Sequence, residues 1–291
     1  MAGNGGIIGP TNDPFFGDLI TQFTAPGSFT ATIPQGDVLV VAGGAGSGNC
    51  GSGAGGAIFT PAHPLPGSAV PVTIGAGGVG VLNSADGNGS PSTFGAASPI
   101  TTTGGGNGTS WGYAGHPGGS GGGGGYTDSG SGHPGGAGTA GQGNAGGTGF
   151  RPSPQFGCRG AGGGKGAAGG NATPSQSGAG AVGVDYGPTF GSQYGDGGYF
   201  AGGGSAAAAG LADGDPAGAG GGGSVGLFPV ANGQDNTGGG AGNVAGEPTS
   251  PGQIGTGGSG AVLVKESGLA SGSGIWTLQE VYTFVKAGNW S

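Results

Sequence analysis

Residues 37–46 read Asp-Val-Leu-Val-Val-Ala-Gly-Gly-Ala-Gly, so a short apolar stretch passes directly into glycine. The first six residues are typical of a buried β-strand. The glycines that follow disfavour an α-helix, because each one costs about 1 kcal/mol relative to alanine. This junction therefore predicts a β domain joined to a glycine-rich structure of a different kind.

Around this strand, short alternating stretches are separated by Pro-Gly, Gly-Asn and Asp-Gly dipeptides, which favour turns. Phe29, Ala31 and Ile33 share one face of a two-residue repeat. Further strands are expected at residues 58–59, 70–74, 92–94 and 99–102. We therefore predict a β-sandwich-like domain over residues 22–103, completed by a strand at 261–265.

Residues 104–260 form a glycine-rich body of low complexity, in a chain where 88 of the 291 residues are glycine. Such a composition is typical of disorder, because little apolar surface offsets the entropy of ordering. The ordered alternative is a set of polyglycine-II-type helices, with three residues per turn, packed through backbone hydrogen bonds. Glycine recurs at every third position in three series: Gly160, Gly163, Gly166 and Gly169; Gly135, Gly138 and Gly141; Gly143, Gly146 and Gly149.

The two ends of the chain differ from its middle. Residues 1–21 are predicted to form an N-terminal arm, and residues 266–291 a linker followed by one short C-terminal α-helix. Thr277 and Glu280 have the spacing of a capping box. The apolar residues that follow recur on one helical face, at Leu278, Val281, Tyr282 and Val285.

The charge balance limits the classes of partner. The formal net charge is −8, with only five basic residues, which argues against binding to nucleic acid. The longest apolar stretch, residues 38–42, is far short of the roughly 20 residues of a membrane-spanning helix, and no secretory signal is expected at the start. The two cysteines, Cys50 and Cys158, allow one disulfide at most, and buried or free thiols are favoured over a bond.

No motif in the sequence argues for catalysis, so we expect no enzyme activity, no cofactor and no metal. Gly-x-Gly-x-x-Gly strings are expected by chance at this glycine content. His116 and His133 lie in the near-repeats AGHPGGSG and SGHPGGAG, which favour two turns, the alternative being a metal or receptor contact. Asp213 and Asp215 favour an ordinary turn, the alternative being a calcium site.

Four stretches carry a resemblance to a known family. They are Pro34 to Gly46, Pro66 to Gly78, Gly89 to Gly95 and Gly258 to Val264. With the glycine-rich body between them, they resemble the glycine-rich domain of bacteriophage tail fibre and adhesin proteins, over about residues 22–265. The related domain also occurs in some animal receptor ectodomains.

The ends of the chain resemble phage proteins separately. The phrases GGIIGP at residues 5–10 and SGIWTLQEVYTFVKAGNWS at residues 273–291 are similar to phrases in virion proteins of tailed phages, particularly cyanophages. There the second phrase usually ends in Trp-Pro, whereas this chain ends in Trp290-Ser291.

These resemblances imply a structural protein of the virion, a tail fibre or adhesin assembled in the host cytoplasm. The implied partners are other tail proteins and a host cell-surface receptor, either a polysaccharide or an outer-membrane protein. A homo-oligomer is expected, with a trimer favoured. The alternative is a purely architectural connector, collar or baseplate component without receptor contact.

Aromatic residues supply the candidates for contact with a receptor, because exposed Trp and Tyr beside polar residues suit stacking on sugars or gripping a protein. The candidates are Trp111, Tyr113, Tyr126, Tyr186, Tyr194 and Tyr199. The alternative for each ring is that it caps the glycine layers and shields their ends. A second set, drawn from the two phage-like phrases, is expected to anchor the chain to the particle or to sister subunits. It comprises Ile7, Ile8, Trp276, Leu278, Val281, Tyr282, Val285 and Trp290.

Overall fold

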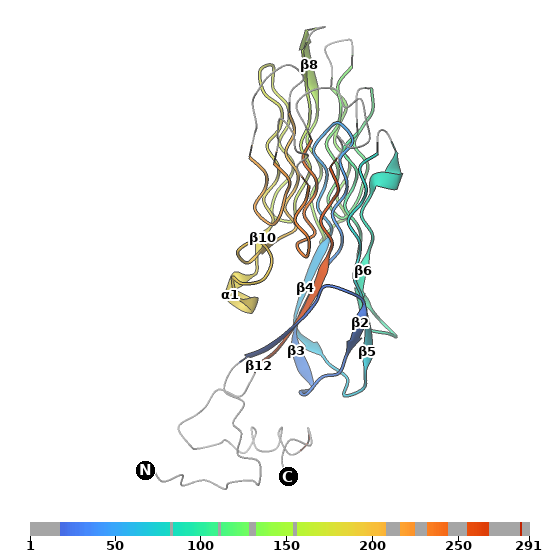
Figure 1. The fold of residues 1–291 in the computed structure, drawn as a ribbon, viewed down its shortest axis with the longest axis vertical. Helices are drawn as coiled ribbons and strands as arrows, with labels where there is room; N and C mark the ends of the chain where they lie inside the picture. Colours follow the sequence, from blue (N-terminus) through green and yellow to red (C-terminus); the bar gives the residue numbers. More distant parts are fainter. Residues whose placement is uncertain are drawn as a thin grey trace, which may run out of the picture.

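The computed structural model describes residues 18–81, 84–109, 112–127, 132–153, 156–207, 216–224, 232–243, 255–267 and 286. These residues form an elongated molecule (Figure 1). Two β-sheets face each other at one end, and a bundle of long extended segments continues from them to the other end. The chain is therefore mainly β, as the strand pattern predicts.

The first sheet has four antiparallel strands in the order β1 (Asp18–Phe23), β12 (Ala261–Ser267), β3 (Gln35–Val41) and β4 (Ala57–Pro64). Leu39 of β3 lies opposite Leu263 of β12 on one side and opposite Phe59 of β4 on the other. A strand near the end of the domain thus lies between two strands from its beginning.

The second sheet has the order β2 (Gly27–Phe29), β5 (Val70–Thr73), β6 (Ser92–Phe94) and β7 (Ile100–Thr102), also antiparallel. The expected strands at 70–74, 92–94 and 99–102 correspond to β5, β6 and β7. The strand expected at 58–59 is longer, because β4 extends through the prolines to Pro64. β1 was not predicted; it begins at Asp18, within the stretch assigned to the N-terminal arm.

A core of alternating side chains joins the two sheets. Val38 and Val40 of β3 are fully buried against Phe29, Val72 and Phe94 of the second sheet. The rings of Phe29 and Phe94 lie 5.8 Å apart. Each such side chain contributes about 1.5–3 kcal/mol on burial, so this cluster stabilises a sandwich, as predicted.

Glu266 of β12 fixes the connection that enters β3. Its carboxylate is 2% exposed, and its Oε1 accepts hydrogen bonds from the Thr32 amide (2.6 Å), the Thr32 hydroxyl (2.9 Å) and the Ile33 amide (3.1 Å). These three hydrogen bonds offset the cost of burying the polar carboxyl group.

The strands of the sandwich continue directly into extended runs of the body. β3 passes into residues 42–48, which return as 51–56 into β4, and residues 255–260 lead into β12. The body therefore continues directly from the strands of the sandwich, with no linker between them, as Figure 1 shows for β3, β4 and β12.

Hydrogen bonds in the body repeat every three residues. Along residues 42–47, amides three positions apart donate to the same neighbouring run, at 2.9–3.0 Å. Ala42 and Ala45 donate to the run 51–56, Gly43 and Gly46 donate to the run 87–91, and Gly44 and Ser47 donate to the run 255–260. This repeat is the one expected of laterally packed polyglycine-II-type helices, which have three residues per turn.

The run 51–56 lies in the interior of this packing. Within the described part of the chain, six other runs exchange backbone hydrogen bonds with it. They contain residues 42–45, 103–106, 120–123, 160–163, 204–205 and 238–241. A helix with threefold symmetry surrounded by six neighbours is hexagonally packed, so the body is an ordered array.

Glycine is required by this spacing. A Cβ atom added at Gly53 would lie 2.1 Å from the Ser120 carbonyl oxygen, and one added at Gly55 would lie 2.1 Å from that of Ala42. Real Cβ atoms essentially never approach so closely. The backbones of neighbouring runs thus occupy the space that side chains would need.

The three-residue glycine series correspond to this packing only in part. The series from Gly135 to Gly141 and from Gly143 to Gly149 lie in consecutive antiparallel runs, and the slip between them is at the turn of residues 140–142. The series from Gly160 to Gly169 is not one helix, because the chain bends at residues 165–167.

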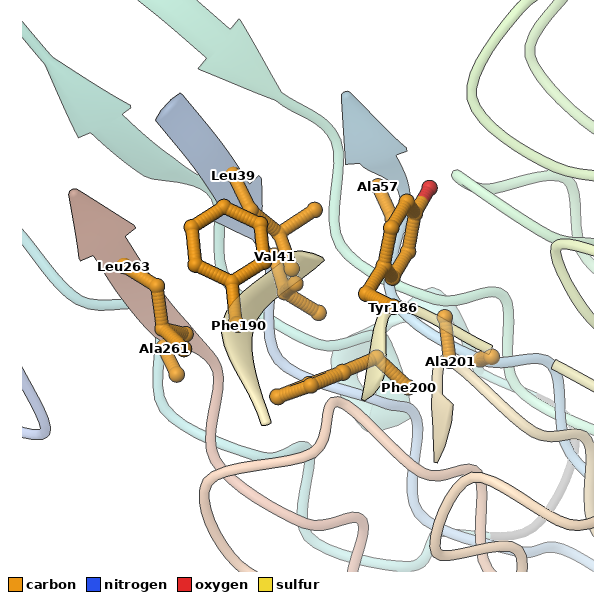
Figure 2. Packing of buried hydrophobic residues seen from close by; sticks show 10 residues of the cluster. Leu39, Val41, Ala57, Tyr186, Phe190, Phe200, Ala201, Ala261 and Leu263 are labelled. Atoms are coloured by element: carbon orange, nitrogen blue, oxygen red, sulfur yellow. The ribbon is translucent and has the colours of Figure 1, made fainter. Parts of the chain in front are cut away.

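A second core lies on the outer face of the first sheet. The segment 184–200, containing β10 (Val184–Asp185), α1 (Gly187–Phe190) and β11 (Tyr199–Phe200), leaves the body to cover this face. Figure 2 shows Tyr186, Phe190 and Phe200 gathered beside Leu39, Val41 and Leu263. Since Leu39 and Val41 alternate with Val38 and Val40, both faces of β3 are buried.

The remaining described elements lie in the body. They are the 3₁₀ turn η1 (Ala85–Gly87) and the hairpin of β8 (Phe150–Ser153) and β9 (Phe156–Cys158), with β8 at the end away from the sandwich (Figure 1). The expected C-terminal helix falls outside the described residues, apart from Lys286.

Candidate functional site

The described candidate aromatics fall into two groups at opposite ends of the body. Tyr113 and Tyr126 lie near the β8–β9 hairpin, since Gly125 donates to the Tyr113 carbonyl and Arg151 of β8 lies over the Tyr126 ring. Tyr186, Tyr194 and Tyr199 lie close to α1, beside the sandwich. Trp111 falls outside the described residues.

Tyr113 presents its ring to solvent from a fixed backbone. The residue is 54% exposed. Its carbonyl oxygen accepts hydrogen bonds from the Gly125 amide (3.0 Å) and from the Thr109 hydroxyl (3.1 Å), which come from two neighbouring runs. An aromatic ring held in this way loses little conformational entropy when a ligand covers it.

Tyr126 has a supporting role instead of an exposed ring. It is only 7% exposed, and the Arg151 guanidinium lies 5.5 Å from its ring centroid, a cation–π geometry. A Cβ added at Gly157 of β9 would lie 2.1 Å from the ring, so the glycine lets the hairpin rest on the tyrosine. The expectation of an exposed Tyr126 is corrected by this packing.

Tyr186 is likewise buried, at 8% exposure, in the second core. Its ring centroid lies 5.7 Å from that of Phe59 and 6.3 Å from that of Phe200, and burial raises the pKa of its hydroxyl. The expectation of an exposed ring is therefore corrected here too. Tyr194 packs against the same core, and Tyr199 pairs with Asp185 between β11 and β10.

The anchoring candidates fall outside the described residues: Ile7, Ile8, Trp276, Leu278, Val281, Tyr282, Val285 and Trp290. Their assignment therefore stays a prediction. In the part of the chain that the structure describes, no helix is long and apolar enough to cross a bilayer.

The histidine repeats are not two separate turns. His116 and His133 belong to neighbouring parallel runs, in which Gly115 donates to Pro134 and Gly118 donates to Ala137. Among the described residues, no group of three His, Cys, Asp or Glu side chains is arranged to hold a metal ion. Asp213 and Asp215 fall outside these residues.

Neither cysteine forms a disulfide, and both are buried, as the sequence favours. Burial raises the pKa of the Cys158 thiol, and the neighbouring Arg159 partly opposes this effect. A protonated, enclosed thiol is a weak nucleophile.

Comparison with known proteins identifies the unit that these elements form. A family model described as a glycine-rich domain matches residues 24–266. The match begins between β1 and β2 and ends within β12, so it takes in the body and all of the sandwich except β1. No curated protein matches the chain.

Proposed function

We propose that this chain, which belongs to the glycine-rich domain family, is a structural protein of a bacteriophage tail, a tail fibre or adhesin that presents the β8 end of its body to a receptor on the host cell. The proposal assigns the sandwich end to attachment and the opposite end to recognition. Its partners would be other tail proteins and a polysaccharide or outer-membrane protein of the host.

The sequence phrases at the two ends of the chain support the phage assignment. GGIIGP at residues 5–10 and SGIWTLQEVYTFVKAGNWS at residues 273–291 resemble phrases of phage virion proteins and lie on either side of the family match. β1 and β12, the described strands closest in sequence to these phrases, are paired in one sheet. The chain therefore enters and leaves the family domain through strands of the sandwich, on the side proposed for attachment.

The observation that carries the recognition role is the exposed ring of Tyr113 at the far end of the molecule. Tyr113 is 54% exposed, and its backbone is held by two runs of a hydrogen-bonded array. Such a ring suits stacking on a sugar face or insertion into a protein pocket, because aromatic anchors dominate small interfaces. Tyr194 and Tyr199, at the sandwich end, are assigned to holding the segment 184–200 in place.

Adsorption of virions to the host tests the recognition role. We expect Trp111→Ala with Tyr113→Ala to reduce the adsorption rate about tenfold or more, since a central aromatic contributes about 2 kcal/mol or more. Val79→Thr is the matched control, because Val79 is 66% exposed on the flank of the body. Adsorption at the wild-type rate by normally assembled Trp111→Ala, Tyr113→Ala virions would favour the alternative, a connector without receptor contact.

Incorporation into particles tests the attachment role separately. Deletion of residues 274–291 removes Trp276, Tyr282 and the other C-terminal anchoring candidates. We expect the shortened protein to fold but to be missing from purified virions. Its presence at the wild-type copy number would show that attachment uses other residues.

A further inference from the structure

Asparagine is followed directly by glycine at residues 4–5, 88–89, 107–108 and 232–233. An asparagine in this position is open to spontaneous deamidation, because glycine has no side chain to hinder attack by its own backbone nitrogen. The first pair falls outside the described residues, and the other three lie in the glycine-rich body. Their surroundings differ, so their rates of deamidation should differ too.

The reaction begins when the backbone nitrogen of the glycine attacks the Cγ atom of the preceding asparagine. A C–N bond forms and closes a five-membered succinimide ring. The bond from Cγ to the side-chain nitrogen breaks, and ammonia leaves with the proton of the glycine amide. Water then opens the ring on either side, which gives aspartate or isoaspartate. The reaction therefore needs a glycine amide released from its hydrogen bond and an asparagine side chain that can turn toward it.

The pair Asn107-Gly108 meets neither requirement. Asn107 is fully buried, and its side-chain nitrogen donates to the carbonyl oxygens of Val81 and Ser84, both at 2.8 Å. The Gly108 amide donates to the Ser52 hydroxyl at 3.1 Å. Both reacting groups are thus fixed, away from the water that would open the ring.

The pair Asn88-Gly89 is also held by neighbouring runs. Asn88 Oδ1 accepts a hydrogen bond from the Asn107 amide at 2.7 Å, and its Nδ2 donates to the Pro117 carbonyl at 3.4 Å. The Gly89 amide donates to the Gly105 carbonyl at 3.0 Å. The ψ angle of Asn88 is 150°, so the backbone is extended there, and ring closure would require it to rotate.

The pair Asn232-Gly233 lies at the surface and is held by one residue. Asn232 is exposed, and Gly233 is half-buried. Asn232 Oδ1 accepts a hydrogen bond from the Thr256 amide at 3.0 Å, and the Gly233 amide donates to the Thr256 carbonyl at 2.9 Å. Thr256 is itself exposed. Displacement of this one surface residue would release both reacting groups together, in contact with water.

We propose that Asn232 is a site of spontaneous deamidation in the folded protein, controlled by its two hydrogen bonds to Thr256, and that the array shields Asn88 and Asn107. A reaction that requires local opening proceeds at its intrinsic rate multiplied by the fraction of open molecules. Opening at Asn232 separates one surface residue, whereas opening at Asn88 or Asn107 separates packed runs. The product carries a carboxylate in place of an amide, and isoaspartate adds a backbone carbon to a run with a three-residue repeat. This inference does not depend on the proposed receptor contact or attachment.

The test compares the three sites within the full-length wild-type protein. Incubation at slightly alkaline pH, followed by peptide mass spectrometry, measures the conversion of each asparagine, and the chain unfolded in urea supplies the intrinsic rates. After division by these rates, we expect Asn232 of the folded protein to react about tenfold or more faster than Asn88 and Asn107. The proposal is overturned if Asn232 reacts no faster than either of them.

Substitution of Thr256 tests the control of the reaction. Thr256→Pro removes the N–H group that holds the Asn232 side chain, and proline suits the extended conformation of the run. We expect deamidation of Asn232 to become about threefold or more faster, with Asn88 unchanged. Thr256→Ser is the matched control, because it retains the amide and should react at the wild-type rate.

Circular dichroism establishes that both variants are folded. An unchanged rate at Asn232 in folded Thr256→Pro would show that Thr256 does not control the reaction. An equal acceleration in Thr256→Ser would also contradict the proposal, because the side chain and not the backbone amide would then be responsible. Should Thr256→Pro fail to fold, the comparison of the three sites in the wild type decides.

Discussion

Inside the body, a hydrogen atom is the largest side chain that most positions accept. At Gly55, a Cβ would lie 2.1 Å from the Ala42 carbonyl oxygen and 2.5 Å from its carbon. The Ala42 carbonyl group belongs to a run whose backbone is hydrogen-bonded to other runs as well, so it cannot move away alone. We expect Gly55→Ala to lower the free energy of unfolding by about 3 kcal/mol or more, as measured by urea denaturation.

Gly67, in the loop between β4 and β5, provides the matched control. Nothing lies within 4 Å of an added Cβ there, and its φ is outside the left-handed region. Gly67→Ala should raise stability by about 0.4–1 kcal/mol, because alanine restricts the unfolded chain. Equal effects of the two substitutions would contradict the close approach of the runs.

His63, in the edge strand β4, gives the sandwich a dependence on pH. Burial lowers the pKa of its imidazole from the ordinary 6.5, and its ring lies edge-on to Phe94 with the centroids 6.0 Å apart. As the pH falls through 6.5, the unfolded chain binds the proton before the folded chain does, so the unfolded state gains stability. The free energy of unfolding should therefore decrease from about pH 6.5 down to the lowered pKa.

The substitution His63→Phe isolates this effect, because it keeps the ring contact and removes the proton. Urea denaturation at about pH 7.5 and about pH 5.5 should show a larger loss of stability in the wild type than in the variant. His116 and His133 are present in both proteins, so their contribution cancels. Equal losses in the two proteins would mean that His63 does not titrate differently on folding.

At the scale of elements, the segment 184–200 is held by a few aromatic side chains. α1 is a single turn of four residues, far too short to be stable alone. Its Phe190 is 1% exposed, and the ring lies edge-on to Phe59 of β4 at 5.9 Å. The docking of this ring therefore determines whether the segment covers the sheet.

We expect Phe190→Ala to cost about 3–5 kcal/mol, the range for removing a buried phenylalanine. Thr189→Ala, in the same turn but only half-buried, should change stability by less than about 1 kcal/mol. Chemical denaturation of both variants makes the comparison. A small effect of Phe190→Ala would mean that the segment contributes little to holding the fold.

The sequence predicts a strand or helix when the residues that determine it lie close together in the chain. β3 is predicted because Val38 to Val41 are all apolar, and both of its faces are covered. β1 is not, because Asp18 to Phe23 show no clear alternation and pair with residues more than 200 positions away. α1 is too short to have a helical period, and it depends on contact with Phe59.

The candidate site shows the same limit of prediction from local sequence. Small or polar residues flank Tyr113, Tyr126 and Tyr186, yet only Tyr113 of the three is largely exposed. In extended runs, the side chains of adjacent residues point to different sides. The residues that flank a tyrosine therefore do not indicate what packs over its ring. Gly157, which packs on the Tyr126 ring, lies in β9, and nothing in the sequence around Tyr126 indicates that contact.

At the scale of the whole molecule, the sandwich and the body are continuous. β1 and β12 join Asp18 to Ser267 and Phe23 to Val262, so the first sheet is complete only when both ends of the domain meet. The array likewise joins runs distant in sequence, such as 51–56 and 238–241. Long-range pairing of this kind slows folding, because chain entropy is lost before the contacts form.

The same continuity predicts that the sandwich and the body unfold together. β3 becomes the run 42–48 with no break, and the Ala42 amide at that junction donates to Gly56 at 2.9 Å, just before β4. Opening the array at Gly55 should therefore release the sheet. In the wild type, the slowest-exchanging amides of β3 and of the run 51–56 should report one free energy of opening.

In Gly55→Ala, amide hydrogen exchange should show that free energy reduced by the same amount in β3, in β12 and in the run 51–56, by about 3 kcal/mol. The substitution lies in the body, so a loss of protection in β12 would pass through the shared backbone network. Retention of wild-type protection in β3 and β12, with loss in the body alone, would mean that the sandwich is an independent folding unit. The single transition is expected because the two parts share strands, and a shared strand cannot be unfolded in one part while its hydrogen bonds persist in the other.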